Sequence, residues 1–129
     1  MQKYLDIVNK IHASPYKLTI VSSGGGTNAI SALLEVAGAS NTILESHIPY
    51  SKESMDTFLN KKPDHYCSLD TCLNMAANAY KKSKEVDSES KTKHLLGIAI
   101  TANLATTYEK KGDHKFFIVI QTYNYTKYL

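Results

Sequence analysis

A short apolar run that breaks into three consecutive glycines is the feature that most constrains this chain. Residues 18–22 read Leu-Thr-Ile-Val-Ser, a β-branched pattern typical of a buried strand, and the glycines follow one residue later. A pattern with helical spacing then begins at Thr27. The sequence therefore predicts a strand, a tight turn and a helix. Because glycine tolerates positive φ, such a turn can bring backbone N–H groups close to a ligand.

The turn is expected to bind an anion, most naturally a phosphate group. The first turn of a helix carries unpaired N–H groups and the positive end of the helix dipole, and both favour negative charge. The ligand-binding residues predicted on this basis are Gly24, Gly25, Gly26, Thr27 and Asn28. The alternative is a plain connection in which a Ser or Thr side chain caps the helix.

Composition limits how an anion can be held. All 15 basic residues are lysine and the chain has no arginine, so the bidentate contacts that usually recognise phosphates or guanine edges are absent. Backbone N–H groups, hydroxyls and lysine ammonium groups must hold the ligand instead. We therefore expect a small-molecule partner and no nucleic acid, although the net charge is +3.

Length, hydropathy and cysteine content predict a single cytoplasmic domain over residues 1–129. No apolar stretch approaches the about 18 residues of a membrane span, and the N-terminus lacks a signal pattern, so no membrane association is expected. Cys67 and Cys72 lack a second pair to complete a zinc site, even with His65 and Asp64 nearby, so neither a metal nor a cofactor is expected. The Tyr-rich end leaves open whether the domain is part of a longer protein.

The pattern of apolar residues predicts alternating helices and strands. In chain order these are a helix over 2–14, a strand over 17–22, a helix over 27–37, a strand over 41–48, helices over 51–59 and 68–84, and strands over 93–101 and 115–122. The connection between the last two strands is too short for a full crossover helix, so they are expected to pair antiparallel. The order predicts an α/β domain with a mixed sheet.

Two nucleotide-binding motifs can be compared with the glycine turn. Gly24-x-Gly26-x-x-Ala29, with Glu45 about twenty residues further on, satisfies a loose form of the dinucleotide fingerprint. A full dinucleotide-binding fold needs more parallel strands than this chain supplies. A P-loop is excluded because no Gly-Lys-Ser/Thr follows the turn.

A different resemblance covers residues 17–122. It rests on five ordered blocks, namely Ser23-Gly24-Gly25-Gly26-Thr27, Val36-Ala37-Gly38-Ala39-Ser40, Pro49-Tyr50-Ser51, Gly97-Ile98-Ala99-Ile100-Thr101-Ala102 and Lys111-Gly112-Asp113-His114. These blocks resemble the C-terminal domain family of the competence/damage-inducible protein CinA, and most closely a divergent eukaryotic branch of it. The resemblance implies a three-layer α/β/α domain with a mixed sheet.

For active members, the resemblance implies nicotinamide-nucleotide amidase activity, in which the carboxamide of nicotinamide mononucleotide is hydrolysed to the acid and ammonia. Such chemistry needs an activated hydroxyl, a base and donors for the oxyanion. Carried over by position, the catalytic residues are Ser23, Tyr50 and Thr101. The lysine expected in the family falls on Met55, and Lys52, three residues earlier on the same predicted helix, is the candidate substitute.

Ligand binding is also expected at Asn103, after the Thr101 strand end, and at His114 in the Gly-Asp-His block. The first hypothesis is an amidase with weakened activity. The alternatives are a non-catalytic domain that binds a pyridine nucleotide, or a structural subunit. The expected partner is a nucleotide resembling nicotinamide mononucleotide, and a homo-oligomer or an attached nucleotidyltransferase-like domain is left open.

Overall fold

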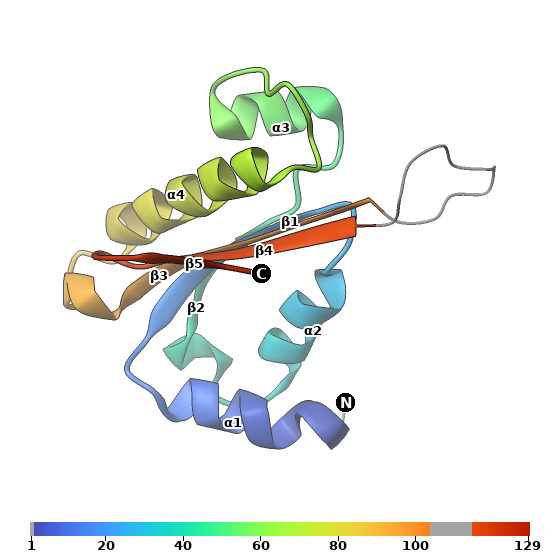
Figure 1. Ribbon diagram of the computed structural model, residues 1–129. Coiled ribbons are helices and arrows are strands. Elements are labelled where there is room, and N and C mark those ends of the chain that lie inside the picture. Colours follow the sequence, from blue (N-terminus) through green and yellow to red (C-terminus); the bar gives the residue numbers. More distant parts are fainter. Residues whose placement is uncertain (1, 104–114) are drawn as a thin grey trace.

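The computed structural model describes residues 2–103 and 115–129 (Figure 1). Its elements are η1 (Gln2–Tyr4), α1 (Leu5–Ala13), β1 (Lys17–Ser23), α2 (Thr27–Glu35), η2 (Ala39–Asn41), β2 (Ile43–His47), α3 (Lys52–Leu59), α4 (Leu69–Val86), η3 (Thr92–His94), β3 (Leu95–Asn103), β4 (Lys115–Gln121) and β5 (Thr126–Tyr128). The order of the larger elements follows the sequence prediction. Among the described helices, none has the length and apolar character needed to cross a membrane.

The strands form one mixed sheet in the order β2-β1-β3-β4-β5. β1 lies parallel to both β2 and β3, whereas β4 pairs antiparallel with β3 and with β5. In Figure 1, α3 and α4 cover one face of the sheet and α1 and α2 the other. The three-layer α/β/α architecture and the antiparallel pairing of β3 with β4 are therefore confirmed.

Each face of the sheet has its own apolar core, because side chains alternate along a strand. On the α4 side, Val21 of β1 and Ala99 of β3 pack with Met55 of α3 and with the buried face of α4. On the α1 and α2 side, Leu18 and Ile20 of β1 pack with Val8 of α1, with Ile30 and Leu33 of α2, and with Val36 directly after α2. The odd-numbered residues of β1 consequently face α4 and the even-numbered residues face α2.

Serine side chains explain where α3 and α4 begin. The Ser51 side chain accepts a hydrogen bond from the backbone N–H of Ser54, and Ser68 accepts one from Thr71 in the same way, so α3 and α4 both start with a serine cap. The predicted cap at Ser51 is confirmed.

Several boundaries differ from the sequence prediction. α2 ends at Glu35, two residues early, and β3 runs from Leu95 to Asn103 rather than over 93–101. The Tyr-rich end contains the short strand β5, which the sequence analysis missed. β5 is only three residues long and its residues are all exposed, so it has no apolar alternation by which a sequence pattern could reveal it.

The two cysteines are expected to react very differently with thiol reagents. Cys72 lies fully buried on α4, with Sγ 3.5 Å from the Ala99 carbonyl oxygen, and burial raises the pKa of its thiol to about 12. Cys67 is partly exposed. Because the thiolate is the reactive form, the folded protein should take up one equivalent of iodoacetamide at pH 8, at Cys67, and a second only after unfolding. Peptide mass spectrometry identifies the site, and the folded Cys67→Ser variant should take up none.

Candidate functional site

The candidate site begins at the carboxyl ends of the parallel strands β1 and β3. Ser23 and Thr101 are register partners there, and both lie on the α4 side of the sheet, two residues beyond Val21 and Ala99. The Thr101 hydroxyl is buried and donates a hydrogen bond of 3.1 Å to the Tyr66 carbonyl oxygen. The Ser23 hydroxyl makes no hydrogen bond to any described residue, so it is free to meet a ligand. Carboxyl ends of parallel strands are common ligand sites in α/β folds.

The glycine turn after β1 depends on the absence of side chains. Gly24 has φ of 79°, and a Cβ there would overlap the carbonyl oxygen of Ala102 on β3. Gly26 has φ of 91°, and a Cβ there would come within 2.8 Å of Ile100. The Ser22 hydroxyl donates a 3.1 Å hydrogen bond to the Gly25 carbonyl oxygen and closes the turn. Glycines at these positions therefore hold the turn directly against the end of β3.

The first turn of α2 carries no side-chain cap. Gly26 occupies the cap position, and within the described residues no side chain caps this helix, so the expected alternative of a Ser or Thr cap is wrong. Thr27 and Asn28 are exposed. The Ala29 N–H donates a 3.1 Å hydrogen bond to the Gly26 carbonyl oxygen. The start of α2 thus lies beside the glycine turn without a side-chain cap, and a helix N-terminus of this kind favours an anion.

Lys52 is the first residue of α3 and points toward the same edge. Its ammonium group lies 5.7 Å from the centre of the Tyr66 ring, a cation–π contact. The Tyr66 hydroxyl donates a 2.7 Å hydrogen bond to Asp56, and this bond raises the pKa of Tyr66 because it stabilises the protonated phenol. Tyr66 thus connects α3 to the β3 end, since its carbonyl accepts from Thr101.

A pocket of about 450 Å³ lies at this edge and brings two predicted residues together, Lys52 from α3 and Asn103 from the end of β3. Six further residues line it, namely Asp64, His65, Tyr66, Cys67, Ser68 and Lys115. None of these six residues was predicted to lie in a ligand site. Segment 64–68 carries no ligand-binding motif, and only the return of the chain between α3 and α4 brings it to the β3 end. The glycine turn adjoins the pocket, because Gly24 contacts Ala102, the neighbour of Asn103.

The remaining predicted residues lie apart from this pocket. Tyr50 is 81% exposed and does not line it. Met55, at the position where the resemblance expects a lysine, is 1% exposed and packs in the α4-side core. His114 lies outside the described residues. Within residues 2–103 and 115–129, no group of three or more His, Cys, Asp or Glu side chains is placed to hold a metal ion.

Solved structures of other proteins share this fold. No family model matches the chain, and no curated protein matches its sequence. A solved CinA superfamily protein from Escherichia coli has a TM-score of 0.73 at 14% identity, covering 97% of this chain and 72% of its own. The competence/damage-inducible protein CihA from Agrobacterium tumefaciens has a TM-score of 0.74 at 16% identity, covering 96% and 74%. A competence or damage-inducible protein from Enterobacter asburiae has a TM-score of 0.72 at 17% identity, covering 95% and 76%. The chain therefore has the fold of the CinA superfamily proteins.

Proposed function

We propose that this chain binds a nicotinamide mononucleotide-like ligand at the carboxyl ends of β1 and β3 and hydrolyses its carboxamide slowly. The observation that carries the proposal is the pairing of Ser23 with Thr101 at these strand ends, between the uncapped glycine turn and the pocket lined by Lys52. The turn offers an anion site and the pocket offers polar and cationic groups. A ligand with a phosphate at one end and a polar carboxamide at the other matches both.

The proposed chemistry is acyl transfer through Ser23. Its oxygen attacks the carboxamide carbon, the carbon–nitrogen bond breaks, and ammonia leaves with the proton taken from the hydroxyl. Water then attacks the resulting ester and releases the carboxylic acid and the free hydroxyl. Lys52 is the candidate to move the proton, and backbone N–H groups of the glycine turn are the candidate donors to the oxyanion.

Two observations support slow rather than fast turnover. Met55 carries no exchangeable proton and lies in the apolar core, so it cannot act as a base. Lys52 is exposed, and its ammonium lies over the Tyr66 ring. The same observations favour the second candidate function, a domain that binds the nucleotide without hydrolysing it. Ammonia release from the bound nucleotide separates the two.

Binding is expected to depend on the phosphate and on the turn. Nicotinamide mononucleotide should bind at least about tenfold more tightly than nicotinamide riboside, because a charged hydrogen-bonding partner at a helix N-terminus contributes about 1.5–3 kcal/mol. Isothermal titration calorimetry measures both affinities. Gly24→Ala should remove the difference, since its methyl group overlaps Ala102 and distorts the turn.

Gly25→Ala is the matched control, because this substitution adds the same methyl group within the turn at a position where φ is not positive. It should retain more of the preference for the phosphate than Gly24→Ala. Equal affinity for the nucleotide and the nucleoside in the unmodified chain would show that the turn does not bind the phosphate.

A further inference from the structure

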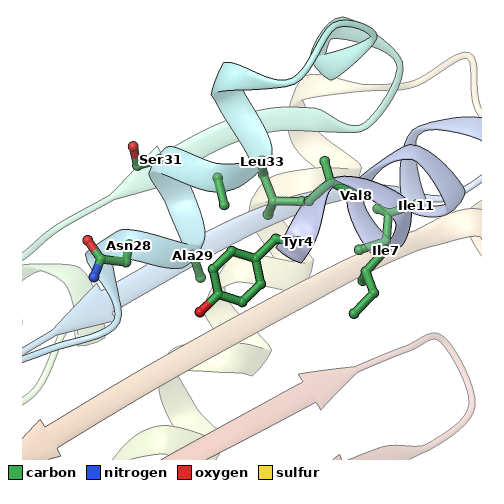
Figure 2. A pocket seen from close by; sticks show the side chains of 9 residues that line it. Tyr4, Ile7, Val8, Ile11, Asn28, Ala29, Ser31 and Leu33 are labelled. Carbon is green, nitrogen blue, oxygen red and sulfur yellow. The ribbon is translucent and has the colours of Figure 1, made fainter. Parts of the chain in front are cut away.

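An apolar groove lies between the N-terminal helices and α2, on the face of the sheet opposite the pocket described above (Figure 2). Its volume is about 550 Å³. Tyr4, Val8 and Ile11 line one side, and Asn28, Ala29 and Leu33 of α2 line the other. A volume in this range, with mostly apolar walls and few polar groups, is typical of sites that bind small organic molecules.

The groove begins where the proposed phosphate site ends. Asn28 is the second residue of α2, so it belongs to the uncapped first turn and also lines the groove. A ligand held by its phosphate at the glycine turn can therefore extend along α2 into the groove.

The lining favours a flat, uncharged ring attached to an anionic group. Figure 2 shows the Tyr4 ring beside Ala29, with Asn28 toward the turn and Ile7 and Ile11 at the other end. No lining residue is charged. The Lys3 ammonium lies 5.0 Å from the centre of the Tyr4 ring, so positive charge stands next to the groove. An aromatic side chain provides a surface on which a base can stack.

We propose that this groove binds the second base of a dinucleotide whose diphosphate lies at the glycine turn. The inference rests on the proposed function, in which the pyridine ring faces Ser23 on the α4 side of the sheet. The second base then lies on the α2 side, and the diphosphate passes across the turn between the two faces. A pyridine dinucleotide occupies both regions, whereas a mononucleotide occupies only the first.

Calorimetric titration of the intact chain with NAD⁺, nicotinamide mononucleotide and AMP tests the groove. We expect NAD⁺ to bind at least about tenfold more tightly than nicotinamide mononucleotide, the factor that stacking of one base on an aromatic ring supplies. Tyr4→Ala removes the stacking surface, and Ala29→Leu fills the groove. Each variant should bind NAD⁺ no more tightly than nicotinamide mononucleotide. Each should leave the affinity for nicotinamide mononucleotide unchanged.

Both altered positions are exposed, so these variants should retain the core, which circular dichroism checks. Tyr123→Ala is the matched control, because Tyr123 is 57% exposed and does not line the groove; it should leave both affinities unchanged.

The outcomes separate the groove from the proposed function. Equal affinities for NAD⁺ and nicotinamide mononucleotide, or an affinity ratio that neither variant changes, overturn the inference and leave the proposed function intact. If AMP and NAD⁺ bind but nicotinamide mononucleotide does not, the result supports base binding in the groove and contradicts the proposed function. Absence of binding by all three ligands contradicts both the groove and the proposed function.

Light scattering tests whether a second copy of the chain covers the groove instead. If it shows a dimer that Tyr4→Ala dissociates while the NAD⁺ affinity is unchanged, a second copy covers the groove and the inference is wrong.

Discussion

Replacing Ser23 with alanine is expected to reduce ammonia release from nicotinamide mononucleotide at least about 1,000-fold, because it removes the attacking oxygen. The same change should alter the affinity by no more than about fivefold, since one neutral hydrogen bond contributes about 1 kcal/mol. The Ser23 hydroxyl makes no hydrogen bond within the described residues, so its removal should leave the fold intact. Ammonia release and calorimetric affinity are measured on the same preparations.

Ser40→Ala provides the matched control, because Ser40 is an exposed serine in η2, outside the site. It should leave both the rate and the affinity unchanged. A measurable rate that survives Ser23→Ala would show that another group attacks the carboxamide. Binding without any ammonia release in the unmodified chain would support the non-catalytic alternative.

Replacing Gly97 with alanine is expected to destabilise the chain by about 3 kcal/mol or more, at or above the upper end of overpacking effects. Gly97 lies on β3 beneath α4, and an added Cβ would overlap the backbone N of Tyr80 and the carbonyl oxygen of Ala76, with the Tyr80 Cα only 2.7 Å away. Backbone atoms cannot rotate aside as a side chain can, so α4 must move off the sheet. The urea unfolding midpoint measures the loss.

Two comparisons show whether the close approach of α4 is the cause. Gly25→Ala adds the same methyl group at a position without positive φ, and it should cost clearly less stability. Ala76→Gly combined with Gly97→Ala should not restore stability, because the obstacle at residue 76 is its carbonyl oxygen rather than its methyl group. A Gly97→Ala midpoint that matches the unmodified chain would contradict the packing described.

The order of elements was predictable because each carries a strong local signal. The β-branched run before the glycines predicts β1, and the observed strand differs by one residue. Apolar residues at helical spacing predict α4, and Cys72, Met75, Ala76 and Ala79 are all fully buried on one face. These patterns involve residues that are close together in the sequence, so they can be recognised without knowledge of the tertiary contacts.

The candidate site was only partly predictable. The glycine turn follows from a motif, and Ser23 and Thr101 follow from a resemblance, but no sequence pattern indicates that Ser23 and Thr101 are register partners. The pocket also takes its walls from segment 64–68 and from Lys115, which carry no recognisable pattern. Residues from separate segments become neighbours through strand pairing and helix packing, which single-sequence patterns do not report.

Met55 illustrates the boundary between the two kinds of information. Its identity is enough to show that an ionisable group is missing where the resemblance expects one. Its burial in the α4-side core, while Lys52 three residues earlier reaches the pocket, follows from how α3 rests on the sheet. Local backbone preferences and apolar spacing thus specify which elements form and which face is buried. The pairing of Ser23 with Thr101, and the placement of Lys52 with Asn103 in one pocket, depend on long-range pairing and packing. The free energy of these contacts arises only when the whole sheet assembles.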